Sequence, residues 1–541
     1  MRLYQPHSGR QFSHLFIVLA TVSLLLAACL GPQVQQRSIS ISVEADNQTL
    51  TVQVPTGSTA RQALEAAGIT LNLLDVSDPA LFTVLQAGDT VHLTRVTEEF
   101  VIEEEQLAYE TQTLRNESLP EGERRLIQPG VNGIIENTYR IVHENGVEVS
   151  RTLVKTVTIQ AAIPEVVMVG SQAPFASLTI NGTLAYISAG NAWVMEGNTG
   201  FRRPIVTTGD LDGRIFEVSP DGQWLLFTRS DEAEDIINTL WVARIPQGEE
   251  EAIEIDLGVE NVIHFADWVP NSVNGIVYSS AEFATTAPGW QANNDLLFLN
   301  FSPNGWASPP RTAIEGNSGG RYGWWGIHFT WSPDGEQLAF ARPDGVGLVD
   351  FDGRRLNLLY EITPLLTRSD WAWMPNVAWS PDGSYLFTVR HAAQPGLAAA
   401  EESPLFDLTV IPLIGGDPLA LALESGMWAY PSVSPVYTLP SGESAYLVGF
   451  LRATNPLQSD TSGYRLVVMD RDGSNARVLF PPDGASGLGP QTVRWSPPEE
   501  EGLPSGYIAV HYQGDLWLVD VNTGQAQQLT ADGLITGLDW E

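Results

Sequence analysis

Few residues of this chain have the type and spacing of a catalytic centre. Residues 316–320, Gly-Asn-Ser-Gly-Gly, match the letters of a nucleophile elbow, but no strand–turn–helix pattern surrounds Ser318, so we expect a flexible loop. The eight histidines are scattered, with no HExxH and no close pair, and a zinc site is not expected. Carboxylates are abundant, but the sequence singles out no pair for glycoside hydrolysis. We therefore expect no catalytic residue, no bound metal and no cofactor.

Aromatic side chains form a second kind of candidate site. They lie a few residues ahead of three copies of a repeated Ser-Pro phrase. An aromatic ring offers a flat apolar face that stacks on a sugar or on a peptide side chain. The alternative is that these loops simply pack on the body of the protein, and the sequence leaves both interpretations open. The candidate ligand-binding residues are Tyr322, Trp324, Trp325, Trp371, Trp373, Trp428 and Tyr430.

The composition limits the partners that these residues could have. Lys and Arg total 28 and Asp and Glu total 64, which gives a net charge of −36. Such a polyanion cannot neutralise phosphates, so we expect no nucleic-acid partner. An acidic binding surface would favour neutral glycans or cationic peptides. The 49 glycines, 35 prolines and 16 tryptophans favour a turn-rich, mainly β fold.

The N-terminal segment carries a targeting signal. Arg2 and Arg10 precede the apolar run 15–28, which is shorter than the roughly 20 residues that span a membrane. The run ends in Leu-Ala-Ala and the sole cysteine, Cys29, and this sequence resembles the bacterial lipobox. The resemblance implies that 1–28 is a lipoprotein signal peptide and that a diacylglycerol is attached to the Cys29 sulfur. A cysteine that follows an apolar run by chance is the alternative.

A lipid anchor would fix where the protein works. Residues 29–36 would be a short tether, and the rest would lie outside the cytoplasm on a membrane surface, either at the cell surface or in the periplasm. The sequence does not say which membrane carries the anchor. The membrane partner would be reached through the lipid alone, since no later apolar run has spanning length.

Residues 37–96 have the pattern of a small α+β module. Alternating segments at 38–43 and 48–54 flank Asp46-Asn47, which predicts a hairpin. Residues 59–67 predict a helix that ends at Gly68. The phrase Ala-Leu-Glu-Ala-Ala-Gly-Ile resembles the small ubiquitin-like domain of cell-wall-remodelling proteins, and this resemblance covers 37–96 alone.

Residues 97–171 predict long strands separated by glycine turns. Strands are expected at 134–144 and 147–160, with a two-residue hairpin at Asn145-Gly146. The glutamates of 98–105 are expected to form a solvated face. Five glycines mark the turns: Gly122, Gly130, Gly133, Gly146 and Gly170. The pattern resembles the five-glycine (G-five) domain of bacterial surface proteins. That resemblance implies either a strand-only spacer or a module that binds glycan, including N-acetylglucosamine-containing glycan.

The region 175–541 is built from a repeat. The phrase Ser-Pro-Asp-Gly begins at Ser219, Ser332 and Ser380, and a short apolar strand follows each copy. Degenerate copies of the phrase lie at 269–271, 434–435 and 496–497. Self-similarity at this spacing, with several short strands per unit, indicates propeller blades. The Trp-Ser-Pro-Asp-Gly pattern resembles the TolB-like propeller repeat.

Seven repeat positions predict seven blades, with six or eight as alternatives because some copies are degenerate. The first blade lacks the usual Trp-Ser strand, and 535–540 has such a strand with no blade after it. We expect 535–540 to close the ring on the first blade. The tryptophans of the repeat are expected to form core between blades, and the loop aromatics are expected around one mouth of the ring. Those repeat tryptophans are Trp331, Trp379, Trp495 and Trp540.

Three functions remain open at this point. The first is a non-catalytic surface lipoprotein that binds envelope glycan or an envelope protein through the G-five module and the propeller face. The second is a propeller hydrolase of glycans or peptides, which requires carboxylates with perturbed pKa values converging in one mouth. The third is an assembly scaffold of the envelope.

Overall fold

The computed structural model describes residues 37–116, 119, 122–171, 175–246, 253–397, 399–500 and 502–541. Cys29, the signal peptide and the tether lie outside the described residues. The chain divides into two compact units, one made of residues up to 112 with 128–165, the other of 113–127 with 166–541. The boundary therefore falls inside 97–171, and each unit is described by itself. No helix in the described parts is long and apolar enough to cross a membrane.

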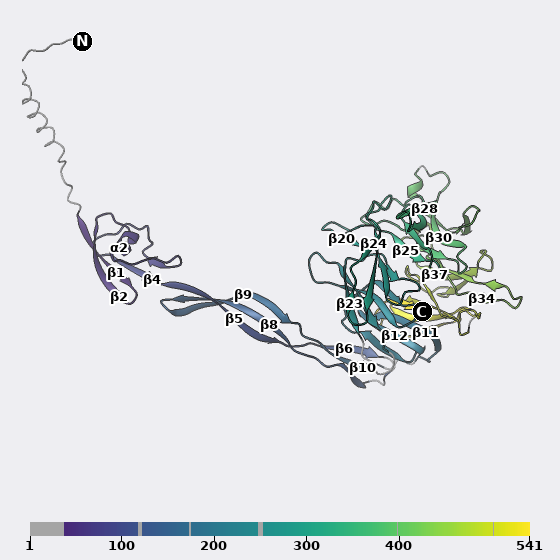
Figure 1. The fold of residues 1–541 in the computed structure, drawn as a ribbon, viewed down its shortest axis with the longest axis horizontal. Coiled ribbons are helices and arrows are strands. Elements are labelled where there is room, and N and C mark those ends of the chain that lie inside the picture. Colours follow the sequence, from purple (N-terminus) through teal and green to yellow (C-terminus); the bar gives the residue numbers. More distant parts are fainter. Residues whose placement is uncertain are drawn as a thin grey trace, which may run out of the picture. The chain divides into compact units, whose positions relative to one another are not determined.

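The first unit begins with a four-stranded sheet and the helix α2 (Ala60–Ala66) (Figure 1). The sheet has the order β2-β1-β4-β3, with bounds β1 Ser38–Ala45, β2 Gln48–Pro55, β3 Val76–Asp78 and β4 Thr90–Thr94. Leu64 of the helix packs on Ile41 and Val91 to form the core. Asp46 and Asn47 have φ of 51° and 58°, which confirms the predicted hairpin.

A three-stranded antiparallel sheet completes this unit. Its order is β5-β8-β9, with bounds β5 Val96–Leu107, β8 Gly133–Glu144 and β9 Val147–Gln160. Asn145 and Gly146 have φ of 49° and 79°, as the predicted hairpin requires. The glutamates of β5 are not merely solvated: Glu98 pairs with Arg140 and Glu103 with Arg151, each at 2.5 Å. These ion pairs join β5 to β8 and to β9 across one face of the sheet.

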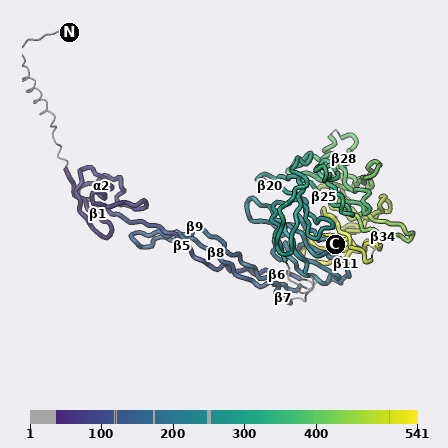
Figure 2. Tube along the Cα trace, in the orientation of Figure 1, coloured from purple at the N-terminus to yellow at the C-terminus, as the bar shows by residue number. Residues whose placement is uncertain are grey.

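The second unit begins with a small sheet that docks on the propeller (Figure 2). Its order is β6-β10-β7, with bounds β6 Thr111–Asn116, β7 Arg124–Gln128 and β10 Glu165–Gly170. Leu114, Val166 and Met168 are buried in one cluster with Trp193 of the first blade. Burial of these side chains explains why the boundary between the compact units lies within the residues that the sequence groups as one module.

The described residues of the second unit form seven blades, as the sequence predicts (Figure 1). Each blade has four strands, written here from the inner to the outer strand. The blades are one, β43 (Ile535–Trp540), β11 (Thr179–Ser188), β12 (Asn191–Asn198), β13 (Arg202–Val206); two, β14 (Leu211–Val218), β15 (Trp224–Ser230), β16 (Asn238–Arg244), β17 (Glu254–Glu260); three, β18 (Ala266–Trp268), β19 (Gly275–Tyr278), β22 (Leu296–Ser302), β24 (Arg311–Ile314); four, β25 (His328–Trp331), β26 (Leu338–Arg342), β27 (Gly345–Asp350), β28 (Arg355–Glu361); five, β29 (Val377–Trp379), β30 (Tyr385–Ala392), β31 (Leu405–Pro412), β32 (Leu419–Ala422); six, β33 (Ser432–Val433), β36 (Leu447–Ala453), β37 (Tyr464–Asp470), β38 (Arg477–Phe480); and seven, β39 (Arg494–Trp495), β40 (Tyr507–Tyr512), β41 (Asp515–Asp520), β42 (Ala526–Gln528). Short added strands are β20 (Ala281–Phe283), β21 (Trp290–Ala292), β23 (Trp306–Ala307), β34 (Tyr437–Thr438) and β35 (Ser444–Ala445).

The ring closes where the sequence predicts. Strand β43 pairs antiparallel with β11, with Trp540 opposite Leu184 and Leu538 opposite Tyr186. The first blade therefore takes its inner strand from the far end of the region. Pairing segments so distant in sequence joins the two ends of the ring and leaves neither terminal blade with an open inner edge.

The repeated phrase acts as a turn that locks the first two strands of a blade. The Ser380 hydroxyl accepts a hydrogen bond from the Tyr385 N–H at 2.9 Å, and Ser219 accepts one from the Trp224 N–H at the same distance. Gly222 and Gly383 have φ of 67° and 69°, the left-handed conformation expected at the fourth turn position. The phrase thus fixes the turn between the first two strands of a blade.

In three blades the repeat tryptophan links the blade to the one before it. The Trp379 indole N–H donates to the Thr330 carbonyl at 3.0 Å, and Trp268 donates to the Glu217 carbonyl at 3.1 Å. Trp495 donates to the Ser432 hydroxyl of the preceding blade, whereas Trp540 donates to the Asn181 carbonyl within blade one. All four are buried, which confirms the prediction of core packing for Trp379, Trp495 and Trp540. Trp331 departs from this pattern: it is half-buried and its Nε1 has no partner among the described residues.

Candidate functional site

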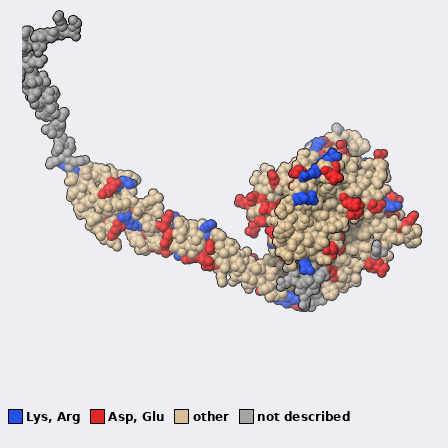
Figure 3. All heavy atoms as spheres, in the orientation of Figure 1, with Lys and Arg blue, Asp and Glu red and all other residues tan. Residues whose placement is uncertain are grey.

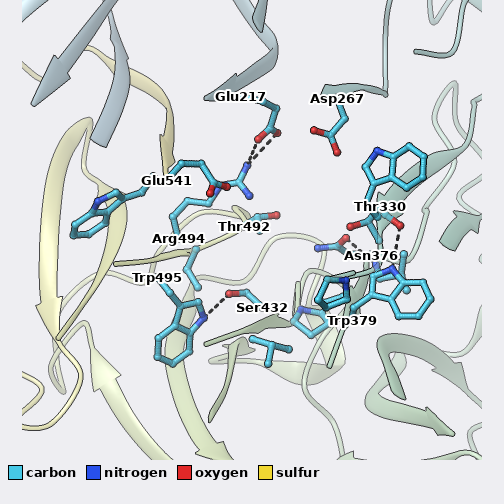
Figure 4. Close-up of a pocket in the computed structure, with 18 of the residues that line it drawn as sticks. Glu217, Asp267, Thr330, Asn376, Trp379, Ser432, Thr492, Arg494, Trp495 and Glu541 are labelled. Atoms are coloured by element: carbon cyan, nitrogen blue, oxygen red, sulfur yellow. Dashed lines mark hydrogen bonds and ion pairs between the residues drawn. The ribbon is translucent and has the colours of Figure 1, made fainter. Parts of the chain in front are cut away.

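A cavity of about 710 Å³ occupies the centre of the ring, and every one of the seven blades contributes to its wall. Its lining comes from the inner strands, from the residues just ahead of them and from the prolines of the repeated phrase. Figure 4 shows this cavity with the Glu217 carboxylate directed at the Arg494 guanidinium and the Asp267 carboxylate nearby. The centre of the propeller is therefore a polar cavity that is not filled by side chains.

One position of the repeat places different chemistry around this cavity. It is the residue directly before the repeat tryptophan, or before the valine that replaces it in blades two and six. Carboxylates occupy this position in three adjacent blades, an arginine occupies it in the blade before them, and neutral residues occupy the rest. From blade one to blade seven the residues are Asp539, Glu217, Asp267, Thr330, Ala378, Ser432 and Arg494. The ring is therefore regular in its backbone and one-sided in its charge.

Arg494 holds two of the three carboxylates. Its Nη2 lies 3.0 and 2.9 Å from the two Glu217 oxygens, and its Nε lies 2.9 Å from Asp539 Oδ1. Asp539 Oδ2 also accepts the Val218 N–H at 2.7 Å. Burial opposes the charge of Arg494, but the Asp539 and Glu217 carboxylates outweigh it and raise the pKa of the guanidinium. The side chains of Glu217 and Arg494 remain 34% and 30% exposed, so a ligand in the cavity can reach them.

Asp267 has no such cationic partner. Its Oδ1 accepts the Trp268 N–H at 2.7 Å, and it forms no ion pair with any described residue. Burial, with a smaller effect of the Asp539 charge, raises the pKa of Asp267 to about 7. Desolvation in the cavity raises the pKa of Glu217 well above its usual range and also raises that of Glu541, whose side chain is exposed. A neighbouring cation or a bound proton would therefore stabilise these carboxyl groups in the folded protein.

Asparagine at position 267 is expected to raise the melting temperature at pH 8 and to leave it unchanged below pH 4. The folded state raises the pKa of Asp267 from 3.8 to about 7, so folding takes up a proton between these values and stability falls as pH rises through that window. The amide removes this cost. Thermal unfolding of wild type and D267N from pH 3.5 to pH 8.5 checks the prediction. A difference in melting temperature that does not depend on pH would contradict it.

The wall of the cavity next to Asp267 carries two histidines. His264 Nε2 donates to the Trp325 carbonyl at 2.8 Å, and burial lowers the pKa of His264 to about 3. His328 lies with its ring centroid 6.1 Å away; its side chain is exposed at the cavity, and desolvation by the cavity wall lowers its pKa. Both imidazoles are therefore neutral at pH 7, and they add no positive charge to the acidic side of the cavity. No group of three or more potential ligands among the described residues is placed to hold a metal ion.

The predicted aromatic residues do not form one rim. Trp324 and Trp325 lie 5.8 Å apart and form one cluster, in which Trp325 also contacts His264 and the hairpin residue Trp290. The second cluster has ring centroids about 6 Å apart and contains Trp371, Trp428 and Tyr430. Tyr322 lies under the Arg321 guanidinium, with 5.6 Å between that group and the ring centroid. None of these six lines the central cavity, although His264 connects the first cluster to it.

Trp373 is buried and does not present its ring to a ligand in this structure. It is 1% exposed, its indole N–H donates to the Met427 carbonyl at 3.0 Å, and its ring packs 4.8 Å from Phe406. The expectation that its ring is accessible at a mouth of the propeller is therefore wrong. The reason is that blades five and six need a large apolar side chain at this point, and the repeat register does not distinguish such a residue from an exposed one.

Ser318 lies where the sequence places it, in the loop between β24 and β25 with no helix after it. Residue types alone did not reveal the charged set in the cavity. Glu217, Asp267, Arg494 and Asp539 are missing from the sequence prediction, because acidic residues are too numerous to choose among. The signal that would have found them is the register: reading the residue before each repeat tryptophan across all blades shows the change of charge.

Comparisons with known proteins identify part of the chain. Residues 98–172 match the family model of the G5 domain. Resuscitation-promoting factor RpfB of Mycolicibacterium smegmatis is 29% identical over 143 residues, and the match spans 26% of this chain and 40% of that protein. The chain thus covers less than half of that relative's length.

Solved structures resemble the two parts separately. The G5 domain of IgA1 protease is 29% identical over 15% of this chain and 94% of that one, with a TM-score of 0.12. A putative 6-phosphogluconolactonase from Bacteroides fragilis is 10% identical and covers 66% of this chain and 98% of its own, with a TM-score of 0.40. The propeller domain of the Trilobed protease from Pyrococcus furiosus is 10% identical, covers 79% and 97%, and has a TM-score of 0.35.

Proposed function

We propose that this chain is a non-catalytic cell-surface lipoprotein that binds envelope glycan or an envelope protein through its G5 domain and its propeller. The lipid at Cys29 would hold it outside the cytoplasm. The central cavity of the propeller would take a cationic or neutral group of the ligand, and the G5 domain would contact glycan. Neither module would chemically change what it binds.

The observation that carries this proposal is the one-sided charge of the cavity. Arg494 compensates Glu217 and Asp539, and Arg214, the other arginine of the lining, pairs with Asp212. Among the described residues, neither Asp267 nor the Glu541 side chain has an ion-pair partner. The composition of the chain adds to the effect, because it has 64 acidic and 28 basic residues. Figure 3 shows acidic side chains distributed over the face that it draws. A concave site with such a potential concentrates cations and repels polyanions. A protonated amine is the group that would best satisfy Asp267.

The G5 domain supports the location and the glycan part of the proposal. Its sequence match covers 98–172. The name of RpfB, a relative found by sequence, refers to resuscitation and states no ligand. Exposed side chains such as Phe100, Ile102 and Leu153 lie on its long sheet, where a stacking partner could reach them. A surface module with this composition fits a protein that is held at the envelope.

A hydrolase is the second candidate, and one observation favours it. The cavity brings together carboxylates whose pKa values are raised by burial, as glycosidases require of their general acid. The same groups would serve cation binding without reaction. Turnover therefore has to be measured together with binding.

Calorimetry with a matched pair of peptides tests the proposal. We expect a lysine tetrapeptide to bind the full chain about tenfold more tightly at pH 8 than its lysine-acetylated copy, since one charge-assisted contact contributes about 1.4 kcal/mol or more. Binding should weaken at pH 5.5, where Asp267 is protonated, because its pKa is about 7. The N-acetylglucosamine tetramer serves as the neutral glycan.

Two variants locate the binding. D267N should remove the preference for the charged peptide and leave glycan binding by the G5 domain intact. D483N makes the same change in charge on an exposed loop of blade six, where Asp483 is 95% exposed, and should have no effect. Equal affinity for the two peptides, or an equal loss in both variants, would overturn the role of the cavity.

A further inference from the structure

A second cavity lies between blades three and four. Its volume is about 540 Å³, and it is separate from the central one except that Trp331 lies in the wall of both. Its lining residues come from β22, from β24, from Trp331 at the end of β25 and from the turn after β27: Phe298, Arg311, Thr312, Ala313, Trp331, Phe351 and Arg354. Nothing in the proposed function uses this cavity.

Trp331, which lines this cavity, is the repeat tryptophan that lacks the usual hydrogen bond among the described residues. In blades three, five and seven the equivalent indole N–H donates to a polar group of the preceding blade. In blade one it donates to the Asn181 carbonyl of β11, the strand next to the closing strand β43. Trp331 makes no such bond, and it lies nearly parallel to Phe351, with 6.2 Å between the ring centroids and 17° between the planes. Phe298 stands edge-on to both rings, 6.5 and 6.1 Å away. The wall therefore consists of three aromatic rings that remain partly accessible.

Two arginines provide the polar side of the cavity. Arg311 lies over the Phe298 ring, 5.1 Å from its centroid, and forms no ion pair with any described residue. Arg354 donates to the Thr312 carbonyl at 3.1 Å and pairs with Glu315, which is 77% exposed, at 3.1 Å. The chain as a whole has 64 acidic and 28 basic residues. This cavity has the opposite sign of charge, because two arginines and no carboxylate line it. Its ligand should therefore be an anion.

The aromatic wall restricts which anion fits. A bare inorganic anion would use the arginines alone and would leave three rings without a partner. A pyranose ring that carries a carboxylate satisfies both sides, because its C–H face stacks on an aromatic ring while its carboxylate accepts a two-pronged hydrogen bond from a guanidinium. We propose that this cavity is a binding site for an acidic saccharide. It differs in position and in preferred charge from the central cavity, and it does not depend on the function proposed for that cavity.

Calorimetry with sugars that differ only in charge tests this site. The probes are a β-1,4-linked glucuronic acid tetramer and cellotetraose, its neutral counterpart of the same length and linkage, each added to the full chain. We expect the acidic tetramer to bind at least tenfold more tightly. Equal affinities, or no binding of the acidic tetramer, would overturn the proposal.

Variants then assign the binding to the cavity. R311Q removes an exposed guanidinium that bonds nothing else, so folding should be unaffected and affinity should fall about tenfold. R355Q makes the same change one residue from Arg354, at a side chain that is 69% exposed and outside the cavity, and should change affinity less than twofold. A tetraglutamate peptide that binds as tightly as the acidic sugar would overturn the saccharide assignment, and an equal loss in R311Q and R355Q would overturn the site.

Discussion

Alanine at position 373 is expected to destabilise the propeller by about 3–5 kcal/mol without a direct effect on any ligand. Trp373 is 1% exposed and lies in the core shared by blades five and six, with Phe406 and Met427 against it. Alanine would leave a cavity and would also strand the Met427 carbonyl, which now accepts the indole N–H at 3.0 Å. Denaturant unfolding of the full chain, followed by circular dichroism, measures the change.

Two controls separate this structural role from a binding role. W373F keeps most of the ring volume and loses only the hydrogen bond, so it should cost much less than W373A. W324A removes a half-buried ring of the first aromatic cluster and should also cost less. If W373A unfolded like wild type and instead weakened ligand binding, the structural role would be contradicted and a binding role for Trp373 would be supported.

Removal of Arg494 is expected to cost about 3 kcal/mol at pH 8, because it leaves two carboxylates in the ring without a counter-charge. The uncompensated charge should cost more at Asp539 than at Glu217, because the Asp539 side chain is 2% exposed and bridges Arg494 and the Val218 N–H. The cost should decrease on acidification, since protonation relieves the uncompensated charges. Chemical unfolding of R494A at pH 8 and at pH 5 gives both values.

Further variants distinguish an ion-pair effect from a packing effect. R494A/E217Q should regain part of the lost stability at pH 8, because the second change removes one of the two stranded charges. R494K keeps the charge but loses the two-pronged geometry, so it should lie between wild type and R494A. A cost that is the same at both pH values and is not reduced by E217Q would mean that Arg494 acts by packing alone.

Much of the fold follows from local patterns in the sequence. The phrase at Ser219, Ser332 and Ser380 predicts the blades because its turn needs these residue types in this order, and the strand at 535–540 predicts ring closure because it has no blade of its own. Asn145-Gly146 predicts its hairpin for the same local reason. The docking of Leu114, Val166 and Met168 on blade one was not predictable, because it depends on which surface faces them.

The site was less predictable than the fold for a physical reason. Aromatic residues in loops read alike whether they are buried, as Trp373 is, or partly exposed, as Trp324 is. Carboxylates gain a role only from their neighbours: Glu217 lies across from Arg494 because the ring brings blades seven and two together, 277 positions apart in sequence. Neither partner is recognisable before closure of the ring is known.

The central claim is that the propeller holds its ligand without transforming it. Mass spectrometry of ligand recovered after incubation with the full chain tests this claim most directly. The lysine tetrapeptide and the N-acetylglucosamine tetramer should both return with unchanged mass, while D267N retains less of the peptide than wild type. Shortened products that appear with wild type and disappear with D267N would contradict the claim and would establish the cavity as a hydrolase site.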